Sequence, residues 1–75
     1  MSTEETTKEV TYHARLENWV FDFNGRLYGN IFDDIQKRFH DAAIVTTSPV
    51  VSGSVEEGQL IVTYSGTIYL LGRRR

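Results

Sequence analysis

Apolar and polar residues alternate strictly from position 10 to position 17, which is the pattern of a β-strand with one buried face. The apolar set is Val10, Tyr12, Ala14 and Leu16. From Trp19 onward the bulky residues occupy odd positions instead. Because a strand changes phase only where it is bulged or broken, the sequence predicts an irregularity at Glu17-Asn18.

A tight hairpin is predicted at Asn24-Gly25, because both residues accept the positive φ that a type I′ turn demands. A two-residue loop places Phe21 opposite Tyr28, which makes a stabilising cross-strand pair. One face of the hairpin is then aromatic, and it carries Trp19, Phe21, Phe23 and Tyr28.

Four later segments are typical of short strands, namely residues 42–48, 50–55, 59–64 and 67–71. Pro49 and the turn signals Glu57-Gly58 and Ser65-Gly66 separate them. Both faces of the last hairpin are apolar, which predicts a strand buried on both sides or an interface. We place Ile61, Ile68 and Leu70 on one face and Leu60, Val62, Tyr69 and Leu71 on the other. Inside strand patterns, Gly29 and Gly53 indicate bulges or close backbone approach.

The segment DDIQKRFHD, residues 33–41, is the only stretch predicted to be helical. Asp33 or Asp34 can cap it, and Ile35 and Phe39 lie four positions apart on one helix face. The segment is too short for an independent helix. We therefore expect one or two helical turns, or a structured loop, with Ile35 and Phe39 plugging one end of the sheet.

The sequence predicts a mainly β fold with five or six antiparallel strands in sequential order and one short helical turn. A small SH3-like, half-open barrel is the first architecture, and an open twisted sheet that dimerises is the alternative. We divide the chain into a disordered arm (1–8), one β-domain (9–72) and a basic tail (73–75).

Composition narrows the function further. With 75 residues and no cysteine, the chain has neither disulfides nor zinc–thiolate sites to support a small core, so we expect a homodimer. A formal charge of −2 argues against electrostatic nucleic-acid binding by the chain as a whole. The sequence has no membrane span and no signal peptide, so a cytoplasmic protein is expected.

Two groups of residues are candidates for a binding surface. The aromatic set forms either the core or a groove for a proline-rich peptide or an unstacked base. The basic set either recognises phosphate or an acidic partner, or keeps an apolar hairpin soluble. Together the candidates are Trp19, Phe21, Phe23, Tyr28, Lys37, Arg38, Arg73, Arg74 and Arg75.

No catalytic constellation is recognisable, and we expect no enzyme, no metal and no cofactor. Serine and threonine residues lie outside any nucleophile elbow, and no glycine loop of the phosphate-binding type occurs. Hard metal ligands gather only at Asp33, Asp34, His40 and Asp41, and their spacing matches no known metal loop.

Three segments in the second half of the chain resemble those of a group of small proteins. They are Arg38-Phe39, Thr47-Ser48-Pro49-Val50 and residues 66–72 (GTIYLLG). Their order is similar to that of small uncharacterised proteins encoded by phages and other mobile elements, in the last half of the chain. Asp41-Ala42 stands where that pattern favours Asp-Gly. The resemblance implies an accessory protein that binds a host target and assigns no functional residue.

Two functions remain as hypotheses. The first is a non-enzymatic β-domain that binds and modulates or inhibits a host protein or defence complex. The alternative is a small barrel that binds nucleic acid through Arg26, Lys37, Arg38 and residues 73–75.

Overall fold

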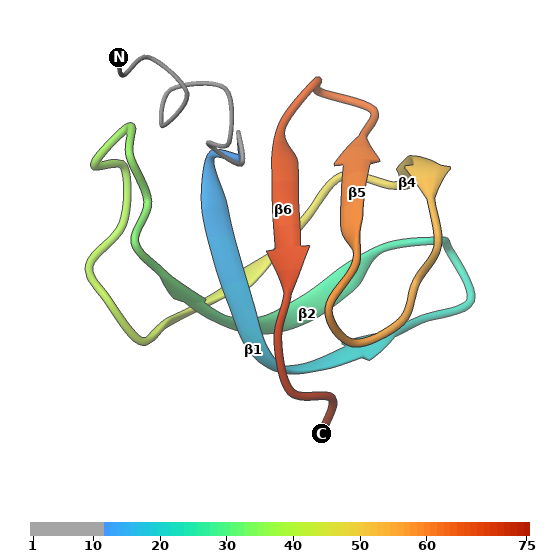
Figure 1. Ribbon diagram of the computed structural model, residues 1–75, viewed down its shortest axis with the longest axis horizontal. Helices are drawn as coiled ribbons and strands as arrows, with labels where there is room; N and C mark the ends of the chain where they lie inside the picture. The colour runs from blue at the N-terminus through green and yellow to red at the C-terminus, as the bar shows by residue number, and fades with distance from the viewer. Residues whose placement is uncertain (1–11) are drawn as a thin grey trace, which may run out of the picture.

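The computed structural model describes residues 12–75, which form six strands and no helix (Figure 1). The predicted mainly β fold is therefore confirmed. The predicted arm, residues 1–8, lies outside the described residues. The strands are β1 (Ala14–Phe21), β2 (Leu27–Phe32), β3 (Ala43–Thr46), β4 (Val50–Gly53), β5 (Leu60–Thr63) and β6 (Ile68–Leu71).

All six strands belong to one sheet with the order β3-β2-β1-β6-β5-β4. Neighbouring strands are antiparallel except β1 and β6, which pair in parallel with Leu16 beside Leu71. The predicted antiparallel order thus holds within each half of the sheet. It fails at the centre, where the first and last strands lie side by side.

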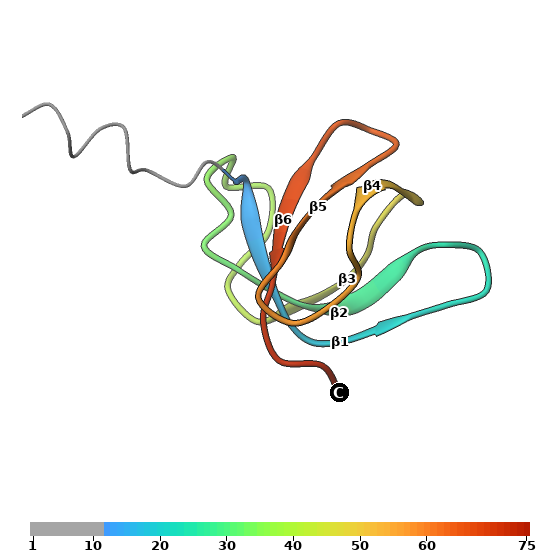
Figure 2. The same cartoon turned by 45° about the vertical axis from the view of Figure 1, so that its right-hand side comes forward.

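The sheet is open, with β3 and β4 as its edges, and it does not close into a barrel. Of the two predicted architectures, the open twisted sheet describes the structure, and its dimerisation stays a prediction. Figures 1 and 2 show that the sheet is strongly curled, so that β2 and β3 cross behind β5 and β6. One face is therefore enclosed between the two halves.

The core lies on this enclosed face. Burying one large apolar side chain contributes about 1.5–3 kcal/mol, so this set supplies the main stabilisation of a chain without disulfides. Its largest member is Trp19, which is fully buried. The buried apolar residues are Ala14, Leu16, Trp19, Leu27, Ile31, Val45, Ile61, Tyr69 and Leu71.

The hairpin between β1 and β2 has a three-residue loop, residues 23–25, instead of the predicted two-residue loop. Asp22 N donates to Arg26 O over 2.9 Å, and Gly25 N donates to Asp22 O over 3.1 Å. A type I turn followed by Gly25 at φ 78° explains this geometry. The Asp22 carboxylate strengthens the turn by accepting the Arg26 N–H over 2.9 Å.

The longer loop shifts the predicted register by one residue. Phe21 pairs with Leu27 rather than with Tyr28, and Tyr28 pairs with Val20. Because paired residues share a face, Phe21 and Tyr28 lie on opposite faces of the sheet. The predicted aromatic face is therefore not formed.

The hairpin between β5 and β6 repeats this turn with the loop of residues 64–66. Gly66 N donates to Thr63 O over 2.8 Å, and Gly66 has φ 90°. Both faces of the hairpin are apolar, as predicted, but Ile61 pairs with Tyr69 on the enclosed face. The outer face carries Leu60, Val62, Ile68 and Leu70.

The irregularity predicted at Glu17-Asn18 is confirmed. The register of β1 against β2 shifts between Glu17 and Val20, and Asn18 has φ 56°. Opposite this bulge lies Gly29, where a Cβ would be 2.9 Å from the carbonyl oxygen of Glu17 and 3.0 Å from Trp19 Cα. The prediction of close backbone approach at Gly29 is therefore also confirmed.

We expect Gly29→Ala to lower the free energy of unfolding by about 1–3 kcal/mol, because the methyl group would press on the backbone of β1. Urea denaturation measures the change. At a strand position with room for the methyl group, alanine would instead stabilise the protein by about 0.4–1 kcal/mol. An increase in stability would therefore contradict the close packing of β2 on the bulge.

Candidate functional site

The structure distributes the candidate residues over three regions. These are the β1–β2 hairpin, the loop of residues 33–41 and the segment of residues 73–75. Figure 1 places the loop at the left of the view, the hairpin tip at the right and residues 73–75 below the sheet. The candidates therefore form no single basic or aromatic patch.

Trp19 belongs to the core and not to a binding groove. Its relative exposure is 0%, and its indole Nε1 donates to the carbonyl oxygen of Gly72 over 3.0 Å. The guanidinium of Arg74 covers its ring at 5.3 Å from the centroid. Of the two predicted places for Trp19, the core and a binding groove, the structure has the core.

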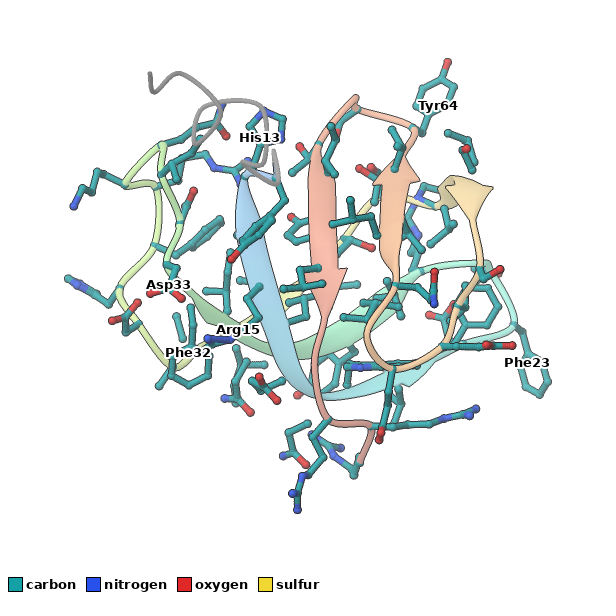
Figure 3. The ribbon with its side chains drawn as sticks, viewed as in Figure 1. His13, Arg15, Phe23, Phe32, Asp33 and Tyr64 are labelled. Atoms are coloured by element: carbon teal, nitrogen blue, oxygen red, sulfur yellow. The ribbon has the colours of Figure 1, made fainter. Side chains whose placement is uncertain are left out.

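The other aromatic candidates reach the surface separately. Phe23 is fully exposed at the tip of the β1–β2 hairpin, and Figure 3 shows it pointing away from the molecule. Phe21 and Tyr28 are each partly exposed, on opposite faces. They do not combine into one groove.

Residues 73–75 run along the second half of β1. Asn18 N donates to Arg73 O over 2.6 Å, and Arg75 N donates to Trp19 O over 2.9 Å. Arg74 forms a parallel bridge with Trp19, so this segment continues the pairing of β6 with β1. The guanidinium of Arg75 lies 5.6 Å from the centroid of the Tyr28 ring. The backbone is held, while the three arginine side chains are exposed.

Two carboxylates hold the same segment. Glu17 Oε1 accepts the Arg73 N–H over 2.7 Å, and Glu57 Oε2 accepts the Arg74 N–H over 2.9 Å. These contacts join positions far apart in the sequence, and no local pattern predicts them.

The loop of residues 33–41 contains no helical turn, so that prediction is wrong, and the alternative of a structured loop describes this segment. Its organising group is the Asp34 carboxylate, whose side chain is only 1% exposed. Oδ1 accepts the Gln36 N–H over 3.0 Å, and Oδ2 accepts the N–H groups of Arg38 and Phe39 over 3.0 and 3.3 Å. The Arg38 Nε lies 3.4 Å from Oδ2. One carboxylate thus fixes the backbone of most of the loop.

Electrostatics keep this carboxylate ionised. Burial acts to raise the pKa of Asp34, but hydrogen bonds from the Gln36 and Arg38 N–H groups, the Arg38 charge and the Phe39 N–H outweigh it. The net result is a pKa below the ordinary value. From the sequence alone, Asp34 is identifiable only as a candidate helix cap or as one of four hard metal ligands.

The two ends of the loop are tied to each other, and its first half is tied to the N-terminal part of the described chain. The carboxylate of Asp41 accepts the Asp33 N–H over 2.9 Å, and Ile35 N donates to His13 O over 2.8 Å. A guanidinium nitrogen of Arg15 lies 3.2 Å from Asp33 Oδ2. Figure 3 shows Arg15 on β1 next to Phe32 and Asp33, and its guanidinium stacks 5.0 Å from the Phe32 centroid. These contacts position the loop against β1 and β2.

The fixed loop presents apolar side chains to the outside. Ile35 is 63% exposed and Phe39 is 44% exposed, so the prediction that they plug the sheet is wrong. Lys37 and Arg38 are exposed between them. The loop surrounds an open hollow of about 650 Å³, lined by Asp33, Asp34, Ile35, Lys37, Arg38, Phe39, His40 and Asp41.

The loop also contains backbone strain. Lys37 has φ 57°, and Ala42, directly after the loop, has φ 74°, in the left-handed region that non-glycine residues rarely adopt. Such positions cost on the order of 1–3 kcal/mol each and persist only where the surroundings impose them. Strain of this kind is concentrated at functional sites, and together with the exposed Ile35 and Phe39 it makes the loop a candidate site within residues 12–75.

The acidic residues of the loop are engaged by protein groups. Within residues 12–75, no cluster of three or more His, Asp or Glu side chains could hold a metal ion. The same residues include no helix that is long and apolar enough to cross a membrane.

No family model matches the chain, and searches of curated proteins and of solved structures likewise find no match.

Proposed function

We propose that this chain is a non-enzymatic protein-binding module and that its contact surface is the loop of residues 33–41. The supporting observation is the buried Asp34 carboxylate, which fixes the loop while Ile35 and Phe39 remain exposed. A protein that orders a strained loop around exposed apolar side chains has a surface suited to a partner.

Preorganisation supports this function. Binding usually costs about 0.5–1.5 kcal/mol for each flexible side chain that becomes ordered, and flexible loops add to that cost. Here the Gln36, Arg38 and Phe39 N–H groups are already held in the free chain. The loop therefore loses little conformational entropy when it binds.

The side chains define the chemistry of the partner. Ile35 and Phe39 fit an apolar recess, and the exposed Lys37 and Arg38 favour acidic residues at its rim. The resemblance to phage and mobile-element accessory proteins makes a host protein or defence complex the expected partner. Occupying a functional surface of that partner would modulate or inhibit it without any chemical step.

Photo-crosslinking from the loop tests the proposal. We expect p-benzoylphenylalanine in place of Phe39 to give one discrete crosslinked protein in a lysate of the host cells. Excess unlabelled wild-type chain should remove the product, whereas the double variant Ile35→Ser/Phe39→Ser should compete at least ten times less well. The same photoreactive residue in place of Phe23, which is fully exposed on the distant hairpin tip, is the matched control. Equal crosslinking from both positions, or equal competition by the double variant, would contradict the proposal.

Nucleic-acid binding is a second candidate, because the exposed Arg75 lies over the partly exposed ring of Tyr28 and the exposed Arg74 precedes it. Basic groups next to aromatic rings are typical of single-strand binding surfaces. Two observations argue against this candidate. Lys37 and Arg38 belong to the loop of residues 33–41, which lies away from residues 73–75 (Figure 1). The Arg26 guanidinium is already engaged, because it donates to Thr47 O over 3.1 Å.

A salt series decides between the two candidates. Fluorescence anisotropy of a mixed single-stranded oligonucleotide should show no binding that falls steeply with salt concentration. Steep salt dependence that disappears in Arg74→Gln/Arg75→Gln, which keeps the backbone pairing of this segment, would favour nucleic acid instead.

A further inference from the structure

The two edges of the open sheet differ in how they are protected. Pro49 precedes β4, the strand has an irregular register between Val50 and Ser52, and Val50 N donates to Gly25 O over 2.7 Å. Proline, bulges and backbone groups already in use are features that prevent a further strand from pairing. The β4 edge is therefore closed to strand addition.

The β3 edge has none of these features. Its residues, AIVT, are uncharged and pair with β2 at four consecutive positions without a bulge. Among residues 12–75, no strand pairs with the other side of β3. Ile44 is 63% exposed there. Long charged side chains, the usual protection of an edge, are absent from β3.

The direction of the free backbone groups follows from the register. Thr47 N donates to Leu27 O over 2.8 Å, and Val45 pairs with Gly29 two positions further along. In an antiparallel ladder, alternate residues exchange hydrogen bonds with the same neighbour. The N–H and C=O groups of Ile44 and Thr46 therefore point away from β2, towards the open edge.

We propose that β3 accepts an extended strand of the partner protein, which adds to the sheet beside Ile44 and Thr46. This inference rests on the proposed function and specifies how the partner binds. The edge is continuous with the loop of residues 33–41, because β3 begins directly after Ala42. A strand paired with β3 thus has one end beside the loop hollow.

This arrangement also specifies the chemistry of the strand. Main-chain hydrogen bonds to Ile44 and Thr46 supply affinity without sequence preference. Selectivity comes from the end of the strand that lies next to the loop, where an apolar residue meets Phe39 and acidic residues face Lys37 and Arg38. The expected ligand is an extended peptide segment with an apolar residue and acidic neighbours.

A displayed library of random nine-residue peptides, selected on the wild-type chain of 75 residues, tests this inference. We expect enriched peptides to bind Thr46→Pro at least tenfold more weakly, because proline removes the outward N–H but no hydrogen bond to β2. The control Thr46→Ser keeps the N–H and should bind within about twofold of the wild type. Circular dichroism establishes that both variants are folded.

A second measurement does not depend on the folding of any variant. N-methylation of an enriched peptide, one residue at a time, should weaken binding at alternate positions only, because one side of an added strand faces β3. Binding that is unaffected by Thr46→Pro, methylation effects without this alternation, or a failure to enrich any peptide would each overturn the inference.

The outcomes separate this inference from the proposed function. If peptide binding is weakened by Ile35→Ser/Phe39→Ser but not by Thr46→Pro, strand addition at β3 is overturned and the loop remains the binding surface. Peptides that depend on Thr46 alone would support the edge and contradict the loop. Light scattering shows whether a second copy of the chain occupies the β3 edge. A wild-type dimer that becomes a monomer in Thr46→Pro would mean that β3 pairs with another copy, and it would overturn the proposal that a partner's strand binds there.

Discussion

Replacing Trp19 with alanine is expected to lower the free energy of unfolding by about 3–5 kcal/mol, which leaves little or no stability in a domain of this size. The indole is fully buried, donates to Gly72 O and lies under the Arg74 guanidinium. The truncation therefore opens a large cavity between the two halves of the curled sheet and leaves a carbonyl oxygen without its donor. Far-UV circular dichroism in urea measures the change, because the variant lacks the only tryptophan of the chain.

Two further variants show whether the loss of stability comes from the buried indole. Trp19→Phe keeps much of the buried volume but not the indole N–H, so it should cost less than alanine. Phe23→Ala removes an aromatic ring that is fully exposed, and it should change stability by no more than about 0.5 kcal/mol. A loss below about 1 kcal/mol for Trp19→Ala would place the indole in a surface groove and contradict its place in the core.

Asp34→Asn is expected to lower the free energy of unfolding by about 2–3 kcal/mol and to loosen the loop of residues 33–41. The carboxylate accepts N–H groups at both oxygens, from Gln36 at Oδ1 and from Arg38 and Phe39 at Oδ2. An asparagine amide presents one oxygen and one NH₂ group, so one set of donors would face another donor. Urea denaturation gives the stability, and hydrogen exchange at residues 36, 38 and 39 reports the loop. Asp41→Asn, which retains an oxygen for the Asp33 N–H, should have little effect.

The pH dependence of the same variant follows from the lowered pKa of Asp34. A carboxyl group whose pKa is lower in the folded than in the unfolded state stabilises the fold at pH values above its unfolded pKa. For an aspartate the unfolded pKa is about 4. That contribution is lost as the pH falls through the folded pKa. The stability difference between wild type and Asp34→Asn should therefore be constant from pH 7 to pH 5 and shrink below about pH 4. A difference that grows on acidification would contradict the assignment.

The alternation of apolar residues was sufficient to predict the strands, and its change of phase located the bulge. Trp19 and Leu16 both belong to the enclosed face although they are three positions apart, and only a bulge at Asn18 allows this. Gly29 was identifiable for a related reason, since a strand residue without a side chain indicates that another backbone passes close by.

The predicted registers of both hairpins differ from the observed ones by one residue, because each loop was predicted from its last two residues alone. Both loops follow a four-residue pattern, Asp22-Phe-Asn-Gly25 and Thr63-Tyr-Ser-Gly66, in which a type I turn ends in a left-handed glycine. The polar first residue favours that turn, and Asp22 accepts N–H groups within it. Including the first residue of each pattern would have given three-residue loops and the observed faces.

The pairing of β1 with β6 had no signal in the sequence. Alternation determines which face of a strand is buried, but it does not identify the neighbour across the sheet. The contacts of Glu17 with Arg73 and of Glu57 with Arg74 likewise join distant segments. They explain why residues 73–75 lie along β1, where the sequence indicated only a charged tail.

The segment of residues 33–41 is not helical because its backbone N–H groups donate to the Asp34 side chain. Ile35 and Phe39 have helical spacing, but the Asp34 side chain accepts the Arg38 and Phe39 N–H groups, which a helix capped at Asp34 would direct to backbone carbonyls. Lys37 in the left-handed region excludes a continuous right-handed helix. A single side chain therefore determines the shape of the loop and exposes the residues that a helix would have buried.

The dissociation constant of the partner recovered through position 39, measured by calorimetry with the wild-type chain and with Ile35→Ser/Phe39→Ser, is the most direct test of the binding loop. Both substitutions affect exposed side chains, so the fold should persist while the apolar contact is lost. We predict that the double variant binds at least thirtyfold more weakly and that Phe23→Ser binds like the wild type. Equal affinity for the wild type and the double variant would contradict the assignment of residues 33–41 as the contact surface.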